Sequence, residues 1–313
     1  MKKIFYTCVT TFFTMAASMA RDYDIINIPS ENFNSRSETP IQLIVAHCVG
    51  LPLEDTLKGF AYKGAERGGL GVAPHYLVPQ ITAQTFIDQF SDLYNLGEVL
   101  LKYPHKVPVI QFVEESDRAY HAGVSTFGKF NELPGCEIGL NSCSIGIEFH
   151  APDYGKDQDW FKFTPFTDAQ LETGANLMSD ICERQKIDRR NIWGHSDISP
   201  WRSTLTSSQV KTDPGPFFPW QELYITHNLG IWPTSSSKLS KIGNLQEYVK
   251  ERLTAIGYKM SEGREWTELD RHVVNAFRMH FMQNPYNVIY PPEEDFGKID
   301  AGLIKFLGQN FNN

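Results

Sequence analysis

The sequence of 313 residues lacks the short motifs of several large enzyme classes. It contains no HExxH, GxSxG, Walker A or GxGxxG pattern, which removes the commonest signatures of zinc proteases, serine hydrolases and nucleotide-binding proteins. Basic residues do not form a dense run anywhere, and the formal net charge at pH 7 is −8. Because proteins that bind nucleic acid normally present a basic face, nucleic acid is not an expected partner.

Long hydrophobic runs are also scarce. The one long apolar stretch, Ile4 to Ala17, follows Lys2 and Lys3 and ends in small residues. This layout is typical of a secretory signal peptide, so residues 1–20 are predicted to be removed on export to the periplasm, the cell envelope or the medium. No transmembrane segment is expected in the mature chain. Its proportions, 41% hydrophobic and 21% charged, are those of soluble globular proteins.

Cysteine is rare, and the predicted mature chain has four: Cys48, Cys136, Cys143 and Cys182. An oxidising compartment would allow two disulfides, with three possible pairings. Cys136 and Cys143 bracket a short loop and form the preferred pair, whereas Cys48 and Cys182 are interpreted as core residues. No CxxC spacing occurs, which argues against a four-cysteine zinc site.

Strands and amphipathic helices alternate between residues 41 and 233, after an N-terminal arm, residues 21–40, that is expected to be irregular. This alternation predicts one α/β domain with a central sheet covered by helices. Strands are expected at residues 41–46, 75–79, 109–113, 144–149 and 191–194, and helices at 53–61 and 168–186.

A serine-rich segment, residues 234–240, is the predicted linker to a second unit at 241–313. Three short helices are expected there. The first ends at Gly257, the second begins after Thr267, and the third lies near residues 303–307.

Nine histidines are present, and residue type alone does not show which of them have a catalytic or metal-binding role. Position favours His47, which ends a buried strand, together with His195 and Asp213 in two polar loops. Two neutral imidazoles and a carboxylate make a zinc shell with a fourth position open to water. Glu148 lies in an otherwise apolar strand and should be either an ion-pair partner or a base with a shifted pKa.

Around these residues the sequence resembles the zinc-dependent N-acetylmuramoyl-L-alanine amidases of the amidase-2 type, most closely their AmiD-like branch. The resemblance implies an α/β (α+β) fold with a central mixed β-sheet flanked by helices, and a catalytic domain at residues 41–233. The helical C-terminal unit resembles the small peptidoglycan-binding domain of that branch. The resembling segments are residues 45–47, 74–78, 118–125, 144–148, 194–200 and 211–216.

The resemblance implies that one Zn²⁺ ion is bound by His47, His195 and Asp213. It implies Glu148 as the general base and Lys211 as the group that stabilises the oxyanion. The implied reaction is hydrolysis of the amide between the lactyl group of N-acetylmuramic acid and L-alanine, in peptidoglycan or muropeptides. The alternative function is that of a non-catalytic peptidoglycan-recognition protein with the same fold.

Other roles are open for several residues. His121 is expected to line the substrate groove. Asp197, two residues after His195, is interpreted as a residue that supports the ligands from behind or as a cap for its loop, rather than as a ligand. Asp213 could instead be a turn residue before Pro-Gly, and Lys211 a solvated surface lysine. The fifteen residues between His195 and Lys211 resemble an insertion relative to the family's compact loop. The C-terminal helices could bind the cell wall or form a structural bundle on the catalytic domain.

Overall fold

The computed structural model describes residues 21–36, 38–137, 139–154, 164–200, 202–203, 208–233, 244–282 and 307. The predicted signal peptide and linker lie outside these residues. So does the third predicted C-terminal helix, apart from the helical residue Leu307.

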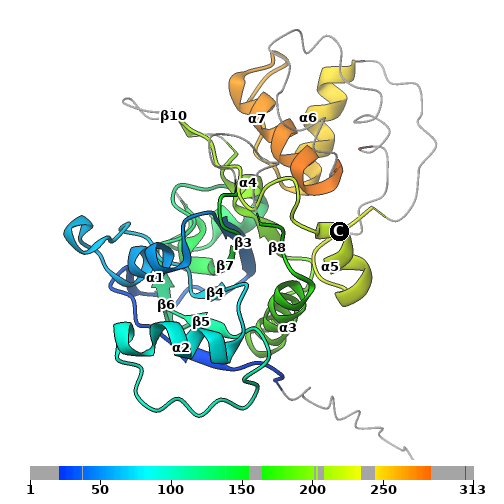
Figure 1. Cartoon of the computed structure of the whole chain (residues 1–313). Coiled ribbons are helices and arrows are strands. Elements are labelled where there is room, and N and C mark those ends of the chain that lie inside the picture. Colours follow the sequence, from blue (N-terminus) through cyan, green and yellow to red (C-terminus); the bar gives the residue numbers. More distant parts are fainter. Residues whose placement is uncertain are drawn as a thin grey trace, which may run out of the picture.

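A six-stranded mixed sheet forms the centre of the molecule (Figure 1), as the resemblance implied. The strand order is β1-β5-β4-β7-β3-β8; β4 and β5 are antiparallel, and the other neighbouring strands are parallel. The strands are β1 (Ile25–Asn27), β3 (Leu43–Val49), β4 (Tyr76–Val78), β5 (Val109–Gln111), β7 (Ser144–His150) and β8 (Ile192–Gly194). Two antiparallel pairs lie apart from it: β2 (Phe33–Ser35) with β6 (Asp117–Ala119), and β9 (Arg202–Ser203) with β10 (Ser208–Gln209).

Helices surround the sheet, and three of them begin at a capping side chain. Thr167 accepts a hydrogen bond from the backbone N–H of Gln170 at 3.1 Å, and Asn244 caps the first C-terminal helix in the same way. The helices are α1 (Leu53–Ala61), α2 (Ala83–Tyr94), α3 (Asp168–Gln185), α4 (His195–Ile198), α5 (Trp220–His227), α6 (Leu245–Ile256) and α7 (Glu268–Phe277). The shorter turns are η1 (Ala65–Arg67), η2 (Gly128–Glu132), η3 (Leu140–Cys143) and the π-helical η5 (Arg278–Met282).

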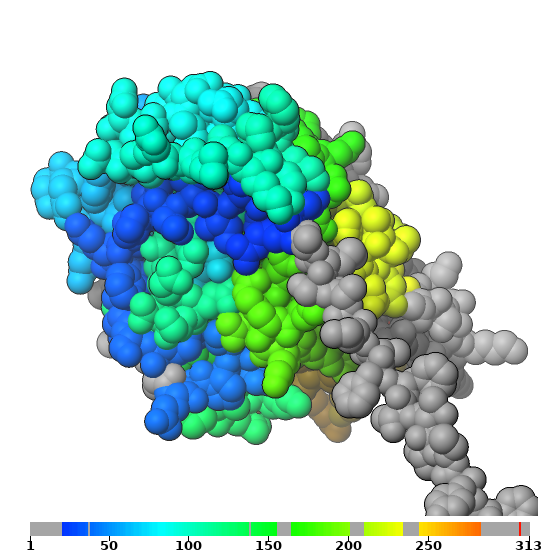
Figure 2. Space-filling view, turned by 90° about the horizontal axis from the view of Figure 1, so that it is seen from below, coloured from blue at the N-terminus to red at the C-terminus, as the bar shows by residue number. Residues whose placement is uncertain are grey.

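The N-terminal arm departs from its expected irregular conformation. Its residues form β1, which pairs in parallel with β5, and β2, which pairs with β6. The expectation was wrong because β1 and β2 are each three residues long, too short to show an alternation of polar and apolar residues. Figure 2 shows this segment, in dark blue, lying across one face of the molecule between the cyan and green segments that include α2 and α3.

Alternate residues of the central strands face different helices. Ile44 and Ala46 of β3 belong to the core formed with α3 and α5. Leu43 and Val45, on the opposite face, belong to a core that includes Leu253 and other side chains of α6 and α7. The two predicted units therefore share one hydrophobic core, and α6 and α7 lie over the β3 and β8 side of the sheet in Figure 1.

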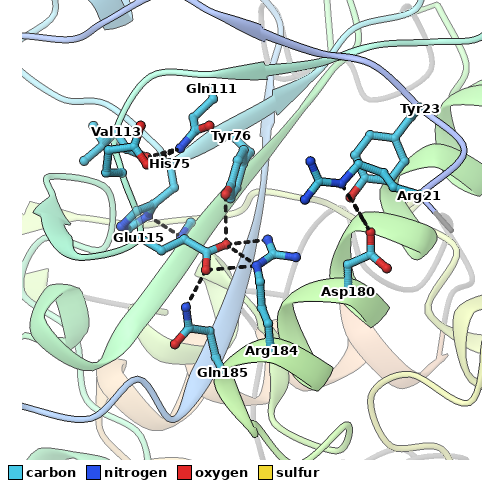
Figure 3. Close-up of polar contacts among 12 residues, drawn as sticks. Arg21, Tyr23, His75, Tyr76, Gln111, Val113, Glu115, Asp180, Arg184 and Gln185 are labelled. Atoms are coloured by element: carbon cyan, nitrogen blue, oxygen red, sulfur yellow. Dashed lines mark hydrogen bonds and ion pairs between the residues drawn. The ribbon is translucent and has the colours of Figure 1, made fainter. Parts of the chain in front are cut away.

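A half-buried carboxylate, Glu115, links α3 to the sheet (Figure 3). Glu115 accepts a hydrogen bond from the Tyr76 hydroxyl of β4 at 2.8 Å and further hydrogen bonds from Arg184 and Gln185 of α3. Arg184 and Gln185 lie in the last turn of α3. This network holds the end of α3 close to the strands that carry the candidate site.

The four cysteines lie within the described residues, and none is in a disulfide. Cys136 and Cys143 are both buried, and a hydrogen bond from the Cys143 thiol lowers the pKa of Cys136. The two side chains are therefore in contact. Their pairing as a disulfide in an oxidising compartment stays a prediction.

Candidate metal centre

Three candidate residues lie at the carboxyl ends of neighbouring parallel strands, where open α/β sheets usually bind ligands. His47 is in β3 and is paired in register with Glu148 of β7. His195 follows β8 directly and begins α4. Because paired residues of parallel strands point to the same face, His47 and Glu148 project side by side.

A triangle of donor atoms forms where Asp213 joins the two histidines. Nδ1 of His47 lies 3.1 Å from Nδ1 of His195, and both nitrogens lie 3.1 Å from Oδ2 of Asp213. Tetrahedral zinc, with ligands at about 2.0–2.2 Å, separates its ligand atoms by roughly 3.4 Å. The donor set and its spacing therefore fit a small divalent cation of this kind.

The electrostatics of the triangle also suit a cation. Burial lowers the pKa of His47 to about 4, and the neighbouring His195 adds to the shift. Burial favours a raised pKa for Asp213, but the adjacent His195 and His47 outweigh it and hold that pKa well below its usual range. Near neutral pH, His47 is thus a neutral donor and Asp213 a charged one.

The loop that carries Asp213 is fixed to the helix that carries His195. The backbone N–H of Ser196 donates to the carbonyl oxygen of Asp213 at 2.8 Å. Two residues later, Gly215 has a φ of +84°, and a Cβ there would lie 1.9 Å from the Tyr154 hydroxyl oxygen. Glycine is required at this point by both the backbone conformation and the close approach.

Glu148 is a half-buried carboxylate beside the triangle. Its Oε2 atom has no hydrogen-bond partner among the described residues. Burial raises the pKa of Glu148 well above its usual range, the nearby Asp213 raises it further, and the Lys211 ammonium lowers it. Such a carboxyl group takes up a proton more readily than an exposed glutamate does.

His121 hydrogen bonds to the nitrogen of His47 that faces away from the triangle. His47 Nε2 lies 3.1 Å from His121 Nδ1, and His121 Nε2 lies 3.1 Å from the Ser144 hydroxyl, which donates to the carbonyl oxygen of Leu140. One set of protons satisfies this whole chain: His47 donates to His121, and His121 donates to Ser144. That tautomer leaves His47 Nδ1 unprotonated and free to bind a metal.

The ring of His121 lies over Gly146 of β7. A Cβ at Gly146 would lie 2.5 Å from Cγ of His121, so a larger residue would displace the ring. The amide oxygen of Asn141 accepts hydrogen bonds from the backbone N–H groups of His121 and Ala122 and fixes their turn. The position of His121 is therefore set from two sides.

A pocket of about 310 Å³ opens beside the donor triangle. It is lined on one side by His121 and the turn that follows it, and on the other by His195, Ser199 and Lys211. His121 lines this pocket and also contacts His47, and its role toward substrate stays a prediction. Of the three predicted metal ligands, His195 lines this pocket.

The sequence analysis named the three residues of the triangle, Glu148, Lys211 and His121 as candidates. It did not find several residues that hydrogen bond to them or to their neighbours. Ser144 was in a resembling segment, but its spacing gave no sign of a contact with His121. Asp197 caps its loop as expected, accepting from the Gly194 backbone N–H at 2.8 Å. Its other partners, Tyr258 and His280, lie in the C-terminal unit and had no visible link to the site.

The mixed sheet and the triangle of His47, His195 and Asp213 define an α/β protein whose donor atoms could hold one metal ion beside a pocket. Residues 37–216 match the model of the N-acetylmuramoyl-L-alanine amidase family, Amidase_2, and the chain belongs to this family. Membership supports an amidase activity over the non-catalytic alternative.

Named relatives agree with this assignment. The chain is 32% identical over 206 residues to the N-acetylmuramoyl-L-alanine amidase AmiD of Escherichia coli, covering 64% of this chain and 68% of that protein. It is 38% identical over 217 residues to the 1,6-anhydro-N-acetylmuramyl-L-alanine amidase AmpD of Enterobacter cloacae, covering 69% and 94%. A solved complex of E. coli AmiD with anhydro-N-acetylmuramic acid-L-Ala-D-gamma-Glu-L-Lys superposes with a TM-score of 0.59 and 26% identity, covering 86% and 91%.

Proposed function

We propose that this protein is an exported, zinc-dependent N-acetylmuramoyl-L-alanine amidase. It hydrolyses the amide between the lactyl group of N-acetylmuramic acid and L-alanine in peptidoglycan or muropeptides. The observation that carries the proposal is the 3.1 Å triangle of His47, His195 and Asp213. Beside it lies Glu148, whose buried Oε2 atom has no hydrogen-bond partner among the described residues. A non-catalytic recognition protein would have no need of this combination.

The triangle would hold one Zn²⁺ ion. Two neutral imidazoles and a carboxylate are the ligand types of catalytic zinc, which leaves a fourth position to water or substrate. When bound, zinc lowers the pKa of water and polarises the carbonyl oxygen of an amide. His121 and Ser144 hold His47 in the tautomer that such a role requires.

Glu148 is proposed as the general base. Its raised pKa suits a group that removes a proton from the attacking water and keeps it through the reaction. The same proton is then available for the amine of the departing L-alanine. The carboxyl group returns to its starting state, so the proton balance closes within one turnover.

Lys211 is proposed to stabilise the oxyanion that forms when water adds to the amide carbonyl. Its side chain lines the groove next to His195, and its charge acts on Glu148. A positive group at the site of developing negative charge favours the transition state over the ground state. His121 lines the same groove, where sugar or stem peptide would lie.

Export is proposed from the signal-like residues 1–20, and the expected location is the periplasm or cell envelope. In the part of the chain that the structure describes, no helix is long and apolar enough to cross a membrane. Peptidoglycan binding by the C-terminal unit stays a prediction from its resemblance.

The test is mass spectrometry of a muramoyl tripeptide incubated with the purified mature protein, with a chelator and after zinc is restored. A free peptide that begins with L-alanine should appear, disappear on chelation and return with zinc. Intact normal and anhydro substrates with metal-loaded protein would overturn the proposal in favour of a recognition protein.

A further inference from the structure

We propose that the helical C-terminal unit positions the metal ligand His195, through Asp197. This inference rests on the proposed metal site and concerns a role for the helical unit that is separate from wall binding. Its residues are Asp197 in α4, Tyr258 after α6, and His280 in η5.

Asp197 is a fully buried carboxylate with three hydrogen-bond donors. The Gly194 backbone N–H donates to Oδ2 at 2.8 Å, the Tyr258 hydroxyl to Oδ1 at 2.5 Å, and His280 Nδ1 to Oδ2 at 2.7 Å. Two of the three donors therefore come from the C-terminal unit. A buried carboxylate that loses its donors is strongly destabilised, so these contacts fix where Asp197 lies.

The carboxylate in turn fixes the backbone on which His195 stands. Gly194 is the last residue of β8 and the N-cap of α4, so its N–H marks the point where strand becomes helix. Asp197 closes that turn by accepting this hydrogen bond. His195 lies inside the closed turn, between Gly194 and Asp197.

The orientation of the His195 ring depends on its backbone more than the orientation of the His47 ring does. The second ring nitrogen of His47 is held by His121, but Nε2 of His195 is buried with no hydrogen-bond partner among the described residues. Metal-binding imidazoles are usually oriented by a partner on that nitrogen. For His195, the backbone turn held by Asp197 takes over that task.

Aromatic neighbours hold the side chains of Tyr258 and His280 in place. The His280 ring stacks on Trp220 of α5 with centroids 3.9 Å apart and an interplanar angle of 13°. The Tyr258 ring meets Phe127 edge to face at 5.3 Å and is 1% exposed. Both side chains thus have one defined position, from which they reach Asp197.

The test compares variants that remove one donor each. Tyr258→Phe removes only the hydroxyl, His280→Phe keeps an aromatic ring on Trp220, and His280→Gln restores an N–H donor. Ser261→Ala is the matched control, because it removes a hydroxyl that donates to another buried carboxylate, Asp270, at 2.5 Å within the C-terminal unit. Zinc affinity is measured by competition with a chelating dye, alongside kcat, KM and thermal unfolding.

Tyr258→Phe and His280→Phe should each weaken zinc binding roughly 3- to 10-fold, below the range for direct partners of ligands, and lower kcat with KM unchanged. His280→Gln should restore zinc affinity relative to His280→Phe. Ser261→Ala should lower the unfolding temperature with wild-type zinc affinity. Unchanged zinc affinity and kcat in both phenylalanine variants would overturn the positioning role alone, whereas wild-type protein that binds no zinc would overturn the metal site as well.

Discussion

Glu148 is half-buried and His75 fully buried near the candidate metal centre, and their surroundings differ. Glu148 has an oxygen without a hydrogen-bond partner among the described residues. His75 accepts from the Gly146 backbone N–H at Nδ1, and its Nε2 faces the carbonyl oxygen of Asp117 at 3.2 Å. The first group is therefore free to exchange a proton, and the second is fixed as a neutral structural imidazole.

Replacing Glu148 with Gln should abolish turnover while zinc stays bound, because a base is not a ligand. Loss of a general base typically costs about 10²- to 10⁴-fold in rate. The measurements are kcat on a muramoyl peptide and zinc content by mass spectrometry. Glu172→Gln, at an exposed position on α3, is the control and should leave both unchanged. Wild-type kcat in Glu148→Gln would refute its role as base.

His75 should make stability fall at acid pH. Burial lowers its pKa in the folded protein to about 3, and Arg36 adds to the shift, whereas the ordinary value is 6.5. The unfolded chain therefore binds the proton first. The contribution of neutral His75 to the free energy of unfolding is complete above pH 6.5. It is lost as pH falls from there towards 3, by about 1.4 kcal/mol per pH unit.

The measurement is urea denaturation of metal-free protein at several pH values between 7 and 4. His75→Asn keeps an acceptor for Gly146 and removes the titration, so its stability should depend less steeply on pH than that of the wild type. Equal slopes for the two proteins would show that His75 does not titrate in this way.

Among the helices and strands, the sequence predicted those features that residues close together in the chain determine, such as helix caps. The helix at α3 begins after Thr167 and ends at Lys186 as expected, and α6 ends at Gly257, because these caps are local. Helix α2 was not predicted, although Thr82 accepts from the Thr85 N–H and Phe86 and Phe90 lie on its buried side. The strand β1 was missed because three residues carry too little periodicity.

The residues of the candidate site could be predicted from the sequence, but most of their hydrogen-bond partners could not. His47, His195 and Asp213 could be grouped because their segments follow a family order, but their partners follow no local spacing. Ser144 is 23 residues from His121, and His280 is 83 residues from Asp197. Such contacts are formed by tertiary packing, so single-sequence patterns do not contain them.

One face of strand β7 contacts His121 and the other packs against α3, and Gly146→Ala should affect the first face. The new methyl group would meet the His121 ring, so stability should fall by about 1–3 kcal/mol and zinc binding by about 10-fold. Urea denaturation and dye competition measure the two effects.

Gly174→Ala in α3 is the matched control, since its Cβ would lie 2.4 Å from Phe149 Cε1 on the other face of β7. This variant should lose stability and keep wild-type zinc affinity. A Gly146→Ala protein that also keeps it would contradict the link from His121 to His47.

For the whole molecule, the shared core has a thermodynamic consequence. Leu253 of α6 and Leu43 of β3 are both fully buried in it. The helical unit and the sheet should therefore unfold together, in a single transition.

Leu253→Ala should lower the stability of that single transition by about 2–5 kcal/mol. Far-ultraviolet circular dichroism and tryptophan fluorescence should report the same midpoint. Ile225→Ala is the control, because Ile225 is 68% exposed on α5 and should change stability by less than about 0.5 kcal/mol. Two separated transitions would show that the units fold independently.

The donors to Asp197 also bear on how this chain can change by recombination. The family match ends at residue 216, so Tyr258 and His280 lie outside the inherited segment that defines the amidases. Exchange of the helical unit for an unrelated one would leave a buried carboxylate at the metal loop with one donor in place of three. A recombinant that keeps all three donors would therefore have to receive the metal loop and the helical unit together.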